Sequence, residues 1–167
     1  MERITMPTSC RIINLTLYNA SPEQLAQGVF EPEPEDKALI KELLTLSAAD
    51  FEKEGEMGAG SRCVPDVLLD QCAFRLMDIC KKYFSDSEIM NPHIYTGALI
   101  GGHPMLREYI IPELKVFGIH PLESFSERVT VEEITAEGMI KKVSYFKHMF
   151  FVELDNISSM NERYYDY

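Results

Sequence analysis

The chain has 167 residues, of which 46% are hydrophobic and 26% are charged, and its net charge is −11. This size suits one domain with a full hydrophobic core, and no apolar run reaches the roughly 18 residues that span a bilayer. The N-terminus lacks the apolar segment of a secretory signal, so we expect a cytoplasmic protein with no membrane partner. A strongly acidic chain is also a poor general binder of nucleic acid, because such binding uses basic side chains.

The charge is not evenly distributed along the chain. Acidic residues concentrate between positions 31 and 56. Basic side chains concentrate in the C-terminal third, in a cluster that comprises Arg128, Lys141, Lys142, Lys147 and His148. This cluster is compatible with a local cationic pocket for a small anion, whereas the overall charge does not favour an extended track for DNA or RNA.

The cysteines and histidines give no metal-binding pattern. The four cysteines form neither a CxxC pair nor a spacing that is typical of zinc sites. Cys72 and Cys80 fall in a helical apolar stripe, so we predict that they are buried free thiols. His93, His103 and His120 are widely separated, and we expect no metal centre and no cofactor.

The N-terminal part predicts a strand, a short helix and a second strand. Residues 11–17 are rich in β-forming side chains and predict the first strand. Ser21 suits the N-cap of the helix that follows, Gln24 completes a capping box, and Gly28 ends the helix. Residues 29–30 predict a brief second strand.

The middle of the chain predicts two helices that are separated by a loop. Residues 35–46 carry their apolar side chains on one side, which indicates a helix. Residues 47–62 are the most loop-like stretch. Residues 64–83 show the strongest helical pattern of the chain, with apolar side chains at spacings of three and four.

A strand, a glycine turn and a helix are predicted next. Residues 93–100 are mostly apolar, which is typical of a strand that is buried on both faces of a parallel sheet. Gly101 and Gly102 close this strand, and residues 104–117 predict the helix that follows it. This strand–Gly-Gly–helix unit is the centre of the expected fold.

The C-terminal third changes to mostly β structure. Four strands are expected, at residues 121–125, 129–134, 139–146 and 150–154. Glu137-Gly138 indicates a hairpin turn, and residues 156–167, which have no periodicity, predict a loose tail. We therefore predict a single α/β domain over residues 1–155. It would be a Rossmann-like three-layer sandwich, with a mainly parallel sheet and a C-terminal antiparallel β-hairpin.

Open α/β sheets bind ligands beyond the carboxyl ends of their strands. Segments 14–19, 101–103 and 124–128 should meet there. The candidate ligand-binding residues of the first two segments are Asn14, Thr16, Gly101, Gly102 and His103. Glycines allow a ligand to approach the backbone, and a helix N-terminus favours an anion. A Gly-Gly pair also often serves only to form a turn, and this one lacks a Walker lysine and a complete GxGxxG motif.

Segment 124–128 contains a possible phosphate clamp. Arg128 with Ser126 would hold a phosphate, because a guanidinium group binds phosphate in a bidentate fork. The alternative is that Arg128 is a surface residue that pairs with Glu127 or Glu132.

Lys147 and His148 complete the set of candidate catalytic residues. Strand alternation sends these two side chains to opposite faces, so we expect only one of them to face the site. No GxSxG or comparable nucleophile motif is present.

Several segments match a known pattern when they are taken together. The runs are Leu99-Ile-Gly-Gly-His-Pro, the helix up to Gly118-Ile-His-Pro-Leu, Ser124-Phe-Ser-Glu-Arg-Val and Val143-Ser-Tyr-Phe-Lys-His148, with Asn14-Leu-Thr and Ser-Pro-Glu-Gln24 before them. This pattern resembles a family of small CRISPR-associated proteins with a Rossmann-like, CARF-like fold. The segment 31–62 is only loosely similar, and the tyrosine-rich tail has no counterpart.

The resemblance implies a role in type III CRISPR antiviral defence, where such proteins bind or cleave cyclic oligoadenylates, often as homodimers. It implies that phosphate and ribose are held by Asn14, Thr16, Gly101, Gly102, Ser126 and Arg128, with Lys147 or His148 near the site. A ring nuclease of this kind needs no metal. The ribose 2′-hydroxyl attacks the adjacent phosphorus and leaves a 2′,3′-cyclic phosphate.

Two alternatives stay open. The protein would be a non-catalytic nucleotide sensor or regulator if the pocket binds the same ligand without cleaving it. It would be an unrelated α/β protein if the glycine turn has a purely structural role.

Overall fold

One mixed sheet organises the computed structural model, which describes residues 9–45, 64–102 and 104–154. The strand order in this sheet is β2-β1-β3-β4-β5. The strands are β1 (Cys10–Leu15), β2 (Val29–Phe30), β3 (Tyr95–Ile100), β4 (His120–Ile134) and β5 (Ile140–Glu153). Strands β1 to β4 are parallel to one another, and β5 is antiparallel to β4. The prediction of an α/β fold with a mainly parallel sheet and an antiparallel hairpin is therefore confirmed.

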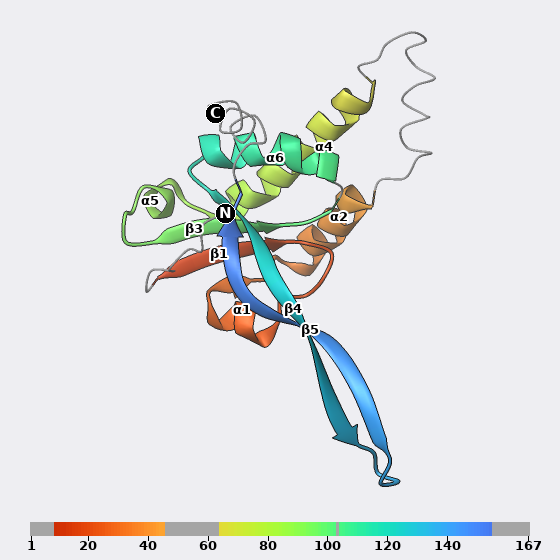
Figure 1. The fold of residues 1–167 in the computed structure, drawn as a ribbon. Coiled ribbons are helices and arrows are strands. Elements are labelled where there is room, and N and C mark those ends of the chain that lie inside the picture. The colour runs from red at the N-terminus through yellow and green to blue at the C-terminus, as the bar shows by residue number, and fades with distance from the viewer. Residues whose placement is uncertain (1–8, 46–63, 103, 155–167) are drawn as a thin grey trace, which may run out of the picture.

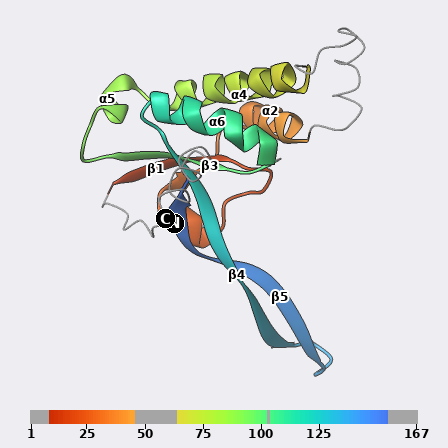
Figure 2. The ribbon, with the colours of Figure 1, turned by 45° about the horizontal axis from the view of Figure 1, so that its top comes forward.

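The helices divide between the two faces of the sheet. They are α1 (Pro22–Ala26), α2 (Pro34–Leu44), α4 (Val64–Tyr83), α5 (Asp86–Ile89) and α6 (Pro104–Val116). Figures 1 and 2 show α2, α4 and α6 together on one face and the short α1 on the other. The main core lies under the three longer helices, and it includes Cys72 and Cys80, which are buried as predicted. Burial raises the pKa of the Cys80 thiol to about 12.

Capping boxes begin both short helices. The Ser21 hydroxyl accepts a hydrogen bond from the Gln24 N–H, and the Gln24 side chain accepts one from the Ser21 N–H, as predicted. The same arrangement of Ser85 and Glu88 begins α5, which we did not predict. Its Ser-x-x-Glu signal is in the sequence, but a helix of one turn has no apolar periodicity to accompany it.

Strand β3 occupies the centre of the sheet. It pairs with β1 on one side and with β4 on the other, and residues 96–100 are buried. The prediction of a strand covered on both faces is confirmed. Because β1 and β3 are parallel and in register, their carboxyl ends bring residues 14–16 beside the Gly101–Gly102 turn.

The predicted β-hairpin is longer than its sequence pattern indicated. The four expected strands form two continuous ones, because β4 and β5 pair from Leu122–Glu153 to Ile134–Ile140. The register shifts where Phe125 pairs with Phe150 and Ser126 with His148, which leaves Met149 as the extra residue of a bulge. Ser126 and Arg128 therefore lie within β4, whereas we expected them after a strand. We call residues 125–150 the arm, which projects from the rest of the protein in Figures 1 and 2.

Two predictions, the loop at 47–62 and the tail at 156–167, lie outside the described residues. Within the described part of the chain, no helix has both the length and the apolar character that crossing a membrane requires.

Candidate functional site

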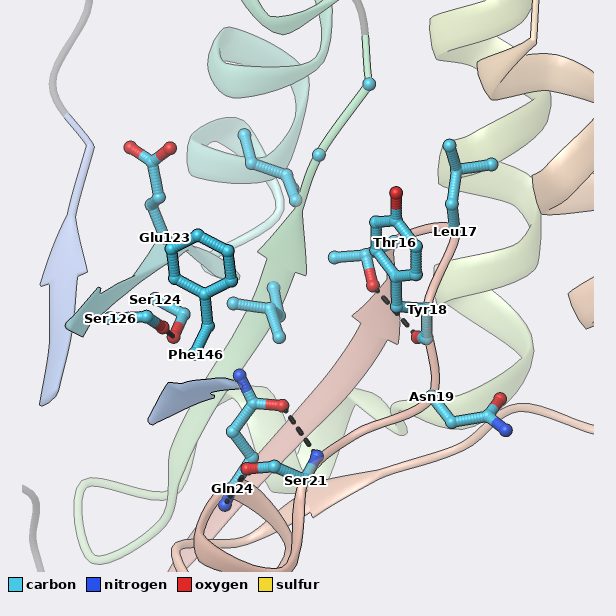
Figure 3. A pocket seen from close by; sticks show the side chains of 14 residues that line it. Thr16, Leu17, Tyr18, Asn19, Ser21, Gln24, Glu123, Ser124, Ser126 and Phe146 are labelled. Carbon is cyan, nitrogen blue, oxygen red and sulfur yellow. Dashed lines mark hydrogen bonds between the residues drawn. The ribbon is translucent and has the colours of Figure 1, made fainter. Parts of the chain in front are cut away.

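A pocket of about 470 Å³ opens where the carboxyl ends of β1 and β3 meet the base of the arm. Its walls come from residues 16–24 before and within α1, residues 99–102 at the glycine turn, and side chains of β4 and β5. Figure 3 shows these segments around the opening. The structure thus brings the three segments that we expected to converge to one place.

The glycine turn forms one wall of the pocket. Gly102 has φ +91°, and a Cβ atom there would lie 2.8 Å from Leu44 Cδ2. A Cβ atom on Gly101 would lie 3.4 Å from Thr16 Cγ2. The backbone conformation and the close contact therefore favour glycine at Gly102, whereas a Cβ atom on Gly101 would make only an ordinary van der Waals contact.

The neighbouring wall, residues 16–20, is held by the buried side chain of Asn14. Its amide nitrogen donates to the Tyr18 carbonyl at 2.8 Å and to Glu31 Oε1 at 2.7 Å. Its amide oxygen accepts from the Thr16 N–H at 3.0 Å and the Thr16 hydroxyl at 2.7 Å. These contacts use all four hydrogen-bonding positions of the amide. Asn14 therefore shapes the wall, whereas Thr16 lines the pocket itself.

Lys37 and Glu31 hold the same wall, and the sequence reasoning missed both. The Lys37 ammonium group donates to the carbonyls of Thr16 at 2.9 Å and Tyr18 at 3.1 Å, and it lies 3.0 Å from Glu31 Oε2. The other Glu31 oxygen accepts from the Ala20 N–H at 2.6 Å. A signal was available, because Lys37 is in helical phase with the apolar side of the predicted helix at 35–46.

The hydrogen bonds to Glu31 shift its titration. Burial acts to raise the pKa of Glu31, but the bonds from the Ala20 N–H, Asn14 and Lys37 outweigh burial and lower the pKa below the ordinary 4.5. A carboxyl group whose pKa is lower in the folded state stabilises the fold above its unfolded pKa. That contribution is lost as the pH falls through the folded value.

We expect the variant Glu31→Gln to be less stable than the wild type at pH 7 by about 1 kcal/mol, because a charged acceptor is lost. We also expect a smaller loss of stability between pH 6 and pH 3. Urea denaturation at several pH values measures both. An acid-induced loss equal to that of the wild type would show that Glu31 does not contribute to the acid sensitivity.

A directed chain of hydrogen bonds runs from the pocket to the buried His148. Its Nε2 lies 3.3 Å from the Gln27 Oε1 acceptor, so Nε2 carries the proton and Nδ1 accepts. Nδ1 lies 2.5 Å from the Ser124 hydroxyl, which in turn lies 3.0 Å from the Ser126 hydroxyl. Burial lowers the pKa of His148, and this effect outweighs the opposing effect of Glu23. The lowered pKa keeps the imidazole neutral at pH 7. Ser124, which we did not single out, is the link in this chain.

The remaining candidates occupy different positions. Lys147 is exposed while His148 is buried, as strand alternation predicted. Arg128 is exposed on the arm and pairs across the strands with Phe146, which lines the pocket. Neither Arg128 nor Lys147 lines the pocket itself. His103 lies outside the described residues.

Two aromatic rings stand on opposite sides of the pocket in Figure 3, Tyr18 on the loop after β1 and Phe146 on β5. They are 78% and 75% exposed. Glu123 is the one carboxylate among the described residues of the lining, and Arg107 pairs with it at 2.8 Å. The pocket thus combines exposed rings, hydroxyl groups and bare backbone. Among the residues that the structure describes, no three histidine, cysteine or acidic side chains are grouped as a metal site.

Residues 65–152 match the model of one family, whose description is "Uncharacterized protein MJ1673 family". The match covers just over half of the chain, so the chain belongs to this family. The matched segment contains the glycine turn and almost all of β4 and β5. No curated protein and no solved structure matches the chain.

Proposed function

We propose that the pocket binds a small adenine nucleotide, specifically a cyclic oligoadenylate, in CRISPR-associated antiviral defence. The main observation in support is the pair of exposed rings, Tyr18 and Phe146, across a polar pocket of about 470 Å³. Every nucleobase has a flat face that stacks on such rings, and base–aromatic stacking contributes about 1–3 kcal/mol per base.

The rest of the lining suits ribose and phosphate. The Gly101–Gly102 turn lets phosphate oxygens approach the backbone, and Thr16, Ser124 and Ser126 supply hydroxyl groups. Arg128 leaves the same side of β4 as Ser126, two residues further along the arm. In this proposal Arg128 reaches the phosphate from the mouth of the pocket, and so it supplies a positive charge that the described lining residues lack.

The chain of hydrogen bonds suggests how a ring would be cleaved without metal. The ribose 2′-oxygen forms a bond to the adjacent phosphorus, the bond to the 5′-oxygen breaks, and a 2′,3′-cyclic phosphate results. The 2′-hydroxyl proton passes to Ser126, a proton passes on through Ser124, and His148 Nδ1 accepts one. Arg128 stabilises the charge that develops on the phosphate, and the departing 5′-oxygen takes a proton from water.

We further propose that the fold is of the Rossmann-like, three-layer class and that the protein is a homodimer. Helices on both faces of a mainly parallel sheet support the first proposal. A two-fold symmetric pair would present equivalent loops to a symmetric ring, which supports the second.

A non-catalytic sensor is the second candidate function, and the positions of three residues favour it. Arg128 and Lys147 do not line the pocket, and His148 reaches it only through Ser124. Such an arrangement binds a nucleotide without requiring turnover.

Incubation of the full chain with cyclic tetra-adenylate and EDTA separates the two functions. Linear products that form without metal support the ring nuclease, whereas a rise in melting temperature without products supports the sensor. If the incubation gives no products and the melting temperature does not rise, that result would contradict nucleotide binding by this pocket.

We expect Arg128→Ala to weaken the binding of cyclic tetra-adenylate about tenfold, because a charge-assisted contact to phosphate is lost. Lys142→Ala is the matched control. It removes the same charge from the same face of the arm but further from the pocket, beside Glu132 at 3.8 Å. Calorimetric titration measures both variants. Equal affinities for Arg128→Ala and the wild type would remove Arg128 from the site.

A further inference from the structure

One face of the arm carries three apolar pairs of side chains, with the charged pair of Glu127 and Lys147 between the first and the second of them. Strand pairing places three pairs of side chains on this face, namely Phe125 with Phe150, Val129 with Tyr145, and Val131 with Val143. The two phenylalanine rings stack with their centres 4.8 Å apart. We call these six residues the apolar face of the arm. None of them is buried, and Phe125 and Tyr145 are each 47% exposed.

The opposite face of the arm has another character. Ser126 and Phe146 there line the pocket, and Thr130 and Ser144 form a hydrogen bond at 2.9 Å. The candidate site therefore uses one face only. A two-stranded hairpin is marginally stable in water unless a hydrophobic face is covered. The apolar face thus needs a covering surface that the described residues of one copy do not supply.

The charge of the arm favours a second copy of the chain as that cover. The chain carries −11, so two copies repel each other at long range. The arm, by contrast, contains four acidic and four basic side chains and has no net charge. Two copies can therefore approach at the arm with little of this repulsion.

The pattern of charges also specifies how two arms fit together. Glu127 and Glu133 on β4 lie on the apolar face, opposite Lys147 and Lys141 on β5. If a two-fold axis runs along the arm, β4 of each copy lies over β5 of the other, so that glutamates meet lysines. If the axis runs across the arm, β4 lies over β4, and glutamates meet glutamates. Pairing along the free edge of β5 is opposed by the lysines on that strand.

We propose that the apolar face of the arm joins two copies of this chain face to face, with their arms parallel. This surface forms the homodimer without any ligand, on the face of the arm that points away from the pocket. The inference therefore gives the proposed homodimer its surface, and it holds whether or not the pocket binds a nucleotide.

The test uses the full chain without nucleotide, in sedimentation equilibrium over a range of concentrations. We expect the wild type to form a dimer, and we expect Val131→Asp to raise its dissociation constant about 100-fold or more, because a carboxylate would be buried without a partner. Thr130→Asp is the control, since it adds the same charge one residue away on the other face. A monomeric wild type, or a Val131→Asp protein that dimerises as tightly, overturns the proposal.

Two further measurements keep the result independent of misfolding. Circular dichroism shows whether Val131→Asp retains its structure, and Tyr145→Asp repeats the test from the other strand.

A carbodiimide couples carboxylates to lysines that they touch, so mass spectrometry of the covalent dimer should find Glu127 or Glu133 joined to Lys147 or Lys141. Links that come only from other surfaces would contradict the parallel arrangement.

Discussion

Gly28→Ala should destabilise the protein by about 3–4 kcal/mol, the largest loss that we expect from adding a single methyl group. Gly28 has φ +99°, a conformation that costs alanine about 1–2 kcal/mol. A Cβ atom would also lie 2.4 Å from the Cys10 carbonyl oxygen, which is backbone and cannot rotate away. The Gly28 carbonyl accepts from the Ile12 N–H at 3.0 Å, so any shift disturbs β1.

Gly138→Ala is the matched control for this substitution. Its φ of +77° is similarly unfavourable for alanine, but a Cβ atom would have nothing within 4 Å. We expect it to cost only about 1–2 kcal/mol. Urea denaturation of both variants separates the backbone strain, which they share, from the collision at Gly28. Equal losses would mean that the chain near Cys10 moves aside at little cost.

His148→Ala should slow any metal-independent cleavage of cyclic tetra-adenylate by about 100-fold or more, because it removes the proton acceptor at the end of the hydrogen-bonded chain. Ser124→Ala should have a similar effect, since it interrupts the same chain. The double variant should be little worse than either single one, because residues that act as one unit are not additive. Single-turnover kinetics in EDTA measures all three.

The pH dependence of cleavage gives an independent check on His148. Its pKa lies below the ordinary 6.5 because it is buried. Protonated His148 cannot accept a proton, so cleavage should stay constant down to pH 6.5 and decline only below it. Ser144→Ala, which removes a hydroxyl of the arm outside the pocket, is the control variant and should leave the rate unchanged. Wild-type rates for His148→Ala would exclude the relay.

The local elements of this fold could be predicted because their signals lie within a few residues of each other. The capping box of Ser21 and Gln24 begins α1, and the apolar stripe at spacings of three and four forms α4. The glycine turn at 101–102 follows β3 for the same reason, since φ at Gly102 requires glycine whatever surrounds it.

The strands of the arm could be predicted only in pieces. Residues 126–128 and 147–149 lack a clear β pattern, yet they are extended because each strand supplies the hydrogen-bonding partner of the other. Strand preference depends strongly on such neighbours. Cross-strand pairing joins segments that are far apart in the sequence, so a short stretch of sequence does not show which partner it will pair with.

The sequence by itself determined an α/β chain with its glycine turn at the end of a buried central strand, because helix caps, apolar periodicity and glycine conformation are local properties. Only the tertiary structure decided which side chains face the pocket. Lys37 reaches the loop after β1, and His148 reaches Ser124, across 21 and 24 positions of sequence. Asn14 uses its side chain in hydrogen bonds within the wall, and Arg128 lies outside the lining. The role of a polar side chain depends on its burial and its neighbours, and both arise only on folding.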